Sequence, residues 1–406
     1  MLIFAVLAVL LCFSMFYRAT NAVLAQDLIT AFNLDANKLG LLSSVFFYAF
    51  AVSQIPMGML LDRIGARKVV TAFALTGAAG AFVFALAEGF YTALIGRVLL
   101  GIGMASALMG ALKVFIGSYP QERFSTLSGI IISIGTLGSV FATSPLVYLN
   151  SIMGWRSTMI YAGIVNALFA IFIFILLKPQ SGRKPADISA RIPRSNDVHP
   201  LHTLRNIIAV LSFWQIGSMA FFRYGTFSAL QGVWLGPYFM NIKHFSPMQT
   251  GNILMMMSIG MAIGSPIAGH FADKIIGKTK PVLMFGIVCY TICLFLLSLR
   301  GGGIAWYSGI CLLLGFFNGF GMLAYSHVQQ IFPFSMSGTA TAGVNFFIMS
   351  GGAFCMQIIG YIISRFSDFH QAYSASAFNL AFFICFAGMA AGSLFYAFSR
   401  QGGKGR

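Results

Sequence analysis

Long apolar stretches separated by short polar segments fill almost the whole 406-residue chain. Each stretch is long enough to cross the hydrocarbon core of a bilayer as a helix rising about 1.5 Å per residue. Continuous apolar runs do not fit the short, alternating segments of a membrane β-barrel. The pattern predicts an all-α polytopic membrane protein with twelve spans, at residues 2–31, 39–61, 69–87, 90–117, 124–148, 157–177, 207–239, 247–270, 281–299, 304–330, 339–364 and 371–397.

One polar segment interrupts this pattern near the middle of the chain. Residues 179–205 combine prolines with charges of both signs, which is typical of a linker. The segment divides the predicted spans six and six. We therefore expect an N-terminal bundle at 1–178, a cytoplasmic linker at 179–205, and a C-terminal bundle with a short basic tail at 206–406.

Two sequence features recur at the same place in each half. An aromatic pair followed by arginine lies inside the first span of each half, as Phe16-Tyr17-Arg18 and as Phe221-Phe222-Arg223. A Gly-x-x-x-Asp-(Arg/Lys) segment follows the second span of each half, beginning at Gly58 and at Gly269. Repeats of this kind predict two bundles related by pseudo-symmetry, with a substrate site between them.

Three segments resemble motifs of the major facilitator superfamily. The segment from Gly58 to Lys68 resembles the family's signature loop at nearly every position, Arg97 to Ala105 resembles the motif RxxxGxGxA, and residues 135–145 resemble a glycine-rich motif loosely. With the twelve spans, the resemblance covers the whole chain and implies a transporter of two six-helix bundles that works by alternating access. It implies gating roles for Gly58, expected also to permit close helix packing, and for Asp62, Arg63, Arg67, Arg97, Asp273 and Lys274.

Composition changes this picture little, but it orients the chain. Only 8% of the residues are charged and 58% are hydrophobic, which no soluble domain matches. The predicted cytoplasmic segments carry sixteen lysines and arginines and the outer segments five, so the net charge of +16 reflects the positive-inside bias and not a nucleic-acid partner. We expect both termini in the cytoplasm of a bacterial cell, in its inner membrane. The first ten residues lack lysine and arginine, so the first span should be retained.

Neither an enzymatic activity nor a cofactor is expected. The six cysteines lie in apolar runs, without convincing metal-ligand spacing, and no catalytic or nucleotide-binding motif is present. The expected partners are the lipid bilayer and a small-molecule substrate, and the protein is expected to act as a monomer.

Arg18 and Arg223 are the strongest candidates for a binding site. A permanent positive charge in the middle of a span is costly, so each arginine should face a cavity or a partner. Guanidinium offers a planar set of donors that fits a carboxylate or a phosphate. In the organophosphate:phosphate antiporters of the resembled family, arginines on helices 1 and 7 hold the anionic group, and Arg18 and Arg223 match that arrangement.

An alternative is that each arginine forms an ion pair with a buried carboxylate and serves folding only. The positions of the acidic residues test this alternative. Of the nine, only Asp27 lies well within a span, and it is about 13 Å along the helix from Arg18. We therefore expect a small organic or phosphorylated anion to neutralise the arginines. The other polar residues expected to shape its site are Tyr17, Asn21, Lys113, Tyr224, Gln231, Asn318, Asn345 and Gln357.

The energy source and the transport direction stay open at this stage. Asp27 and His327 are the candidates for proton coupling, and exchange of one anion for another is the mechanism that needs no such group. The alternatives are a proton-coupled carrier of amino acids or peptides, and an exporter of drugs or siderophores. Glycine and proline between Gln231 and Tyr238 suggest a bendable outer gate in the seventh span.

Overall fold

The computed structural model describes residues 2–118, 124–177, 205–299, 302–366 and 373–400. Within these ranges every regular element is a helix. The predicted linker, apart from Arg205, and the basic tail beyond residue 400 lie outside the described residues.

The helices of the N-terminal half follow the predicted spans closely. Ten helices of the described chain are long and apolar enough to cross a membrane, and in four of the predicted spans of this half the agreement is direct. Gly154 has a φ of +76°, which divides the last helix of this half where the fifth predicted span gives way to the sixth. The elements are α1 (Leu2–Phe32), α2 (Ala36–Ile64), α3 (Ala66–Ala85), α4 (Phe90–Met104), α5 (Ser106–Ser118), α6 (Phe124–Phe141) and α7 (Ser144–Leu176).

The C-terminal half contains more breaks in regular α-helix. The seventh span runs through two π-helical segments, and the tenth changes briefly to a 3-10 turn. The elements are α10 (Leu211–Ala229), η2 (Leu230–Trp234), α11 (Leu235–Pro237), η3 (Tyr238–Ile242), α12 (Pro247–His270), η4 (Phe271–Ile275), α13 (Thr279–Ser298), α14 (Ile304–Gly319), η5 (Phe320–Met322), α15 (Leu323–Ile331), α16 (Phe334–Arg365) and α17 (Ala375–Ala397).

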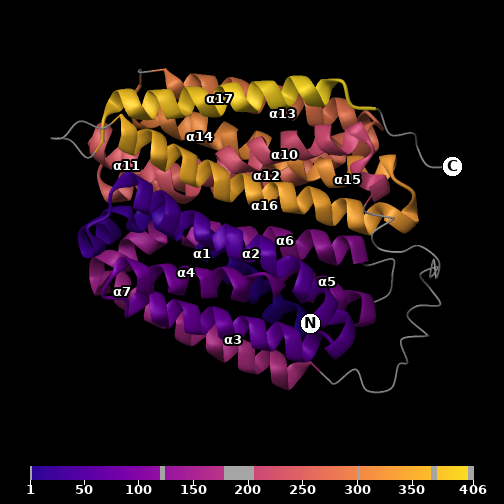
Figure 1. The fold of residues 1–406 in the computed structure, drawn as a ribbon, viewed down its shortest axis with the longest axis horizontal. Helices are drawn as coiled ribbons and strands as arrows, with labels where there is room; N and C mark the ends of the chain where they lie inside the picture. The colour runs from indigo at the N-terminus through magenta and orange to yellow at the C-terminus, as the bar shows by residue number, and fades with distance from the viewer. Residues whose placement is uncertain (1, 119–123, 178–204, 300–301, 367–372, 401–406) are drawn as a thin grey trace.

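The two halves lie side by side as two helix bundles, and α1 begins at the same end of the molecule at which α17 ends (Figure 1). The prediction of an all-α polytopic fold with two bundles is confirmed. We call the end that carries the turn between α1 and α2 the α1–α2 end.

Glycines let the two bundles approach each other closely near the α1–α2 end. A Cβ on Gly40 of α2 would lie 2.9 Å from the carbonyl oxygen of Met356 on α16, and a Cβ on Gly236 of α11 would overlap the carbonyl oxygen of Ala22 on α1. Small residues at helix crossings allow this backbone contact inside a membrane, where the hydrophobic effect does not drive helix association. The glycines therefore close the two halves against each other at this end.

Trp234 fills the space between these crossing helices. Its side chain is fully buried, its Nε1 donates to the carbonyl oxygen of Met356 at 3.0 Å, and its ring approaches the sites of Gly40 and Gly360. Trp234 ends the π-helical segment η2, and such segments often occur at functional sites. The bendable segment expected in the seventh span is thus part of the contact between the halves.

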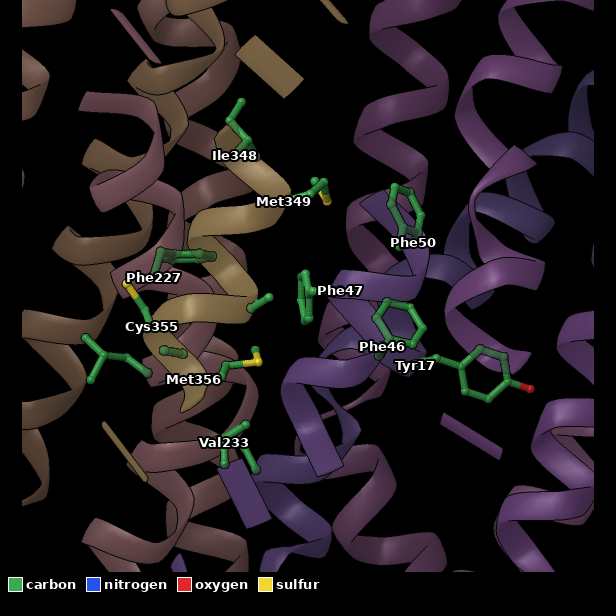
Figure 2. Packing of buried hydrophobic residues seen from close by; sticks show 14 of the residues in the cluster. Tyr17, Phe46, Phe47, Phe50, Phe227, Val233, Ile348, Met349, Cys355 and Met356 are labelled. Atoms are coloured by element: carbon green, nitrogen blue, oxygen red, sulfur yellow. The ribbon is translucent and has the colours of Figure 1, made fainter. Parts of the chain in front are cut away.

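Aromatic side chains continue this contact toward the middle of the molecule. Phe47 and Phe50 of α2 face Met349 and Met356 of α16, whereas Tyr17 points away from this contact into the N-terminal bundle (Figure 2). A Cβ on Gly352 would lie 3.0 Å from the ring of Phe47.

Replacing Gly236 by alanine should destabilise the closed contact. Overpacking of a filled interface costs about 1–3 kcal/mol, because side chains or backbone must shift. We expect a lower thermal unfolding midpoint for the detergent-purified Gly236→Ala protein. Gly309→Ala is the matched control, since a Cβ there meets open space; equal midpoints for both variants would contradict the packing argument.

Candidate functional site

Arg18 reaches from the N-terminal bundle to the C-terminal bundle. Its Nη1 donates to the hydroxyl of Tyr224 on α10 at 3.3 Å, and its Nη2 donates to the Ser14 hydroxyl, one turn earlier on α1, at 3.4 Å. The guanidinium carbon lies 4.4 Å from the ring centroid of Phe50 on α2, which is a cation–π contact. Its Nε is buried without a hydrogen-bond partner. Arg18 is therefore half-buried and held only by long bonds to neutral hydroxyls.

Arg223 is held differently, within the C-terminal bundle. Only 4% of its surface is exposed, and its Nη1 donates to the backbone carbonyl of Asn318 at 2.7 Å and to the Asn318 side-chain oxygen at 2.5 Å. Asn318 lies one residue before the end of α14, where the carbonyls of an α-helix are open to outside partners. The Nε of Arg223 is also buried without a partner.

The two arginines belong to one polar cluster between the bundles. Tyr224 bonds Arg18, and Tyr325 of α15 lies close enough to interact electrostatically with Tyr224 and with both arginines. The Tyr325 hydroxyl donates to the side-chain oxygen of Asn345 on α16 at 3.0 Å. We call Arg18, Arg223, Tyr224, Tyr325, Asn318 and Asn345 the two-arginine cluster.

Among the described residues, no carboxylate pairs with either arginine of the cluster. Asp27, the acid nearest to Arg18 along its helix, accepts a hydrogen bond from the Nδ2 of Asn150 at 2.8 Å instead. The cluster therefore contains two positive charges whose hydrogen-bond partners in the described structure are hydroxyl, amide and carbonyl groups. Such a site is electrostatically suited to an anion.

The cluster includes one residue that the sequence reasoning missed. Tyr325 is absent from the expected site residues, although it carries an aromatic hydroxyl in the second half of the tenth predicted span. Its place within a predicted span was the only sequence signal for a role in the site. That signal is weak, because many tyrosines in membrane helices serve packing alone.

Several expected site residues lie elsewhere. Asn21 donates to Ser43 at 2.7 Å and Gln231 donates to Ser258 at 2.8 Å, each within its own bundle. Gln357 does contact the other half, because it accepts a bond of 3.2 Å from Tyr48 of α2. Tyr17 is fully buried within the N-terminal bundle, and Lys113 lies half-buried on α5.

Arg97 joins three helices of the N-terminal bundle. Its Nη1 donates to the carbonyl of Tyr17 on α1 at 3.0 Å, and its Nε donates to the carbonyl of Leu42 on α2 at 3.4 Å. Its guanidinium carbon lies 5.0 Å from the ring centroid of Phe46. With 1% of its surface exposed, Arg97 occupies the core of this bundle.

The gating residues expected from the loop motif are mostly exposed in this conformation. Arg67 donates from Nε to the carbonyl of Phe174 on α7 at 2.7 Å, so it ties α3 to α7 within one bundle. The expected close packing at Gly58 is wrong here, because no described heavy atom lies within 4 Å of a Cβ built there. Arg63, Asp273 and Lys274 are exposed, and the side chain of Asp62 is outside the described set.

His327, the second proton-coupling candidate, forms its hydrogen bonds with residues outside the two-arginine cluster. Its Nδ1 is 2.8 Å from the hydroxyl of Tyr396 on α17, and its Nε2 is 3.1 Å from the carbonyl of Arg400. The two ring nitrogens therefore contact the last turn of α17 and the segment that directly follows it.

Comparison with known proteins agrees with this architecture. The family model of the Major Facilitator Superfamily matches residues 6–356, and the chain belongs to this family. A D-galactonate transporter of Escherichia coli O6:H1 is 24% identical over 378 residues, covering 85% of each chain. A hexuronate transporter of Bacillus subtilis is 23% identical over 368 residues, covering 88% of this chain and 86% of that protein.

Solved structures show the same fold. A D-xylose-proton symporter aligns with a TM-score of 0.78 at 15% identity, covering 100% of this chain and 98% of that one. A bacterial homologue of the human lysosomal transporter Spinster, in an inward-facing and occupied conformation, aligns with a TM-score of 0.74 at 16% identity, covering 98% and 96%. The family model and the relatives named as transporters identify the protein as an integral membrane transporter and not an enzyme.

Arg97→Ala should cost much more stability than Arg18→Ala. Truncating a large, fully buried side chain costs about 2–5 kcal/mol, whereas Arg18 is half-buried and its two bonds are long. We expect a clearly lower thermal unfolding midpoint, or loss of the folded peak in size-exclusion chromatography, for Arg97→Ala alone. A midpoint for Arg18→Ala as low as that of Arg97→Ala would contradict this distinction.

Proposed function

We propose that the protein is a secondary active transporter that moves a small organic anion by alternating access, with the anion held between Arg18 and Arg223. One observation carries the proposal: arginines from opposite bundles enter the same polar cluster, and neither has a carboxylate partner among the described residues. A bound anion would supply the missing negative charge to both bundles at once. Ligand binding would then favour the conformation in which both arginines reach it.

A hydroxylated carboxylate fits the cluster better than a bare anion. Tyr224, Tyr325 and Asn345 add hydroxyl and amide groups beside the guanidinium groups, and these can bind substrate hydroxyls. The relatives named as transporters of galactonate, of galactarate or D-glucarate, and of hexuronate all carry acidic sugars. We therefore infer that a sugar acid is the substrate, in preference to a phosphate ester.

The described conformation would be closed toward the outside of the cell. The positive-inside rule places the α1–α2 end outside, and the glycine contacts of Gly40 and Gly236 close the bundles there. Both termini would then lie in the cytoplasm of a bacterial cell, with residues 179–205 linking the bundles on that side of the inner membrane. The transporter would work as a monomer, because the site lies between the halves of one chain.

An exporter of lipophilic cations is disfavoured by the same cluster. Two uncompensated guanidinium groups repel a cationic substrate in a medium of low dielectric constant. A carrier of amino acids or peptides would still bring a carboxylate to an arginine, so the substrate tests below include such compounds.

Arg18→Ala and Arg223→Ala should each abolish binding of the anion. Each removes one of two charges that face the substrate, and losing a charge-assisted hydrogen bond costs about 1.5–3 kcal/mol or more. The measurement is the ligand-induced thermal shift of purified protein with D-galactonate, D-glucarate, D-glucuronate, glycerol phosphate and glutamate. Arg365→Ala, which removes an exposed arginine at the end of α16, is the matched control.

Binding that survives in either cluster variant, or that is lost equally in Arg365→Ala, would refute the two-arginine site. A shift with glycerol phosphate but with none of the sugar acids would keep the site and change the substrate class. A shift with glutamate alone would favour the amino-acid carrier.

Asp27→Asn should leave exchange of labelled anion intact. The substitution keeps the contact of residue 27 with Asn150 and removes only its ability to carry a proton. We expect proteoliposomes of Asp27→Asn to exchange internal for external anion at the wild-type rate. If exchange persists but accumulation driven by a proton gradient is lost, Asp27 couples transport to protons and the pure exchange mechanism is wrong.

A further inference from the structure

The two arginines of the cluster differ in how firmly they are held. Arg18 makes bonds of 3.3 and 3.4 Å to hydroxyl groups and is half-buried. Arg223 is 4% exposed, and two oxygens of Asn318 engage a single one of its nitrogens at 2.7 and 2.5 Å. One guanidinium can therefore adjust its position, and the other is fixed.

Gly321, three residues after Asn318, also packs against the side chain of Arg223. A Cβ on Gly321 would overlap the Cζ, Nε and Nη1 atoms of Arg223, so the guanidinium lies directly against the Gly321 backbone. Gly321 is part of the 3-10 turn η5, which directly follows α14. The same break in the tenth span therefore supplies both the acceptors and the flat surface on which Arg223 rests.

The partner of Arg223 is an amide where a carboxylate would fit. Asparagine and aspartate have nearly the same shape, and aspartate would form a stronger, charge-assisted bond with arginine. An aspartate would also cancel the arginine charge. The amide of Asn318 fixes the side chain of Arg223 but does not cancel its positive charge. The buried Nε of Arg223 also still lacks a hydrogen-bond partner.

We propose that Asn318 is a positioning residue that fixes Arg223 without neutralising it, so that Arg223 is the rigid half of the anion site and Arg18 the adjustable half. This inference rests on the proposed function, since it assigns a role within that site. It also gives Asn318 a different task from the direct substrate contact expected from the sequence.

The decisive variant is Asn318→Asp, tested with D-galactonate by ligand-induced thermal shift and by isothermal titration calorimetry. At pH 8 the new carboxylate pairs with Arg223, and the anion must displace it, so we expect Kd to rise by about tenfold or more. The ligand-free protein should unfold at or above the wild-type temperature, because the new bond is charge-assisted. A residue with a merely structural role would not combine these two effects.

A second variant supplies a readout specific to charge. A carboxylate paired with arginine stays ionised well below pH 5, so the loss of affinity in Asn318→Asp should be the same at pH 8 and at pH 5. Asn318→Leu, which removes the side-chain acceptor and adds no charge, should weaken binding less than Asn318→Asp and should lower the unfolding temperature of the ligand-free protein. Asn241→Asp is the matched control, because Asn241 lies on η3 and bonds only the carbonyl of Pro237 in the described structure.

Two results distinguish failure of this inference from failure of the proposed function. If the wild type binds D-galactonate and Arg223→Ala does not, wild-type affinity in Asn318→Asp or in Asn318→Leu overturns the positioning role alone. If none of the sugar acids, glycerol phosphate or glutamate shifts the wild type, the proposed function fails and the inference fails with it.

Discussion

The structure depends on keeping two guanidinium charges inside a membrane protein without a carboxylate partner for either in the described chain. An arginine at the centre of a membrane helix costs about 2.5–3.5 kcal/mol on insertion scales. Phe50, Tyr224 and Ser14 reduce this cost for Arg18, and Asn318 reduces it for Arg223. All four are neutral, so they solvate the charges without cancelling them. The break between α14 and η5 serves the same purpose, because it exposes the carbonyl that Arg223 uses.

The glycine contacts near the α1–α2 end complement this central charge. Backbone packing at Gly40 and Gly236 holds the bundles together at one end, and the cluster holds uncompensated charge between them. Packing of this kind is sensitive to small displacements, because a gap of about 0.5–1 Å already removes about a quarter to a half of the attraction between the atoms. An anion that draws the bundles together at the cluster can therefore offset the energy lost when the glycine contacts separate. In the proposed function, alternating access requires this balance between the two sets of contacts.

The sequence predicted the spans and the two arginines, because hydropathy and a charge within an apolar run are local signals. Orientation about the helix axis was not predictable in the same way. Tyr17 and Arg18 are chain neighbours, but at 3.6 residues per turn their side chains diverge by about 100°, and only Arg18 reaches the other bundle. Membrane helices apolar on every side give no periodic signal for the buried face. The hydrogen bonds from Arg223 to Asn318 likewise depend on the break between α14 and η5. Glycines in this segment permit such a break, but their presence in the sequence does not predict it.

The difference between the two arginines bears on why an empty site would not reorient freely. Tyr224 belongs to the opposite bundle from Arg18, so their bond already spans the halves without any anion. A hydroxyl is a weaker partner for guanidinium than a carboxylate, whose charge-assisted bonds are about twice as strong. The empty transporter can therefore bring its bundles together only with a poor substitute for substrate, and Arg223, fixed by Asn318, keeps its full positive charge. On the proposed function, these uncompensated charges make the loaded form the better one for crossing between states, which favours exchange over net release.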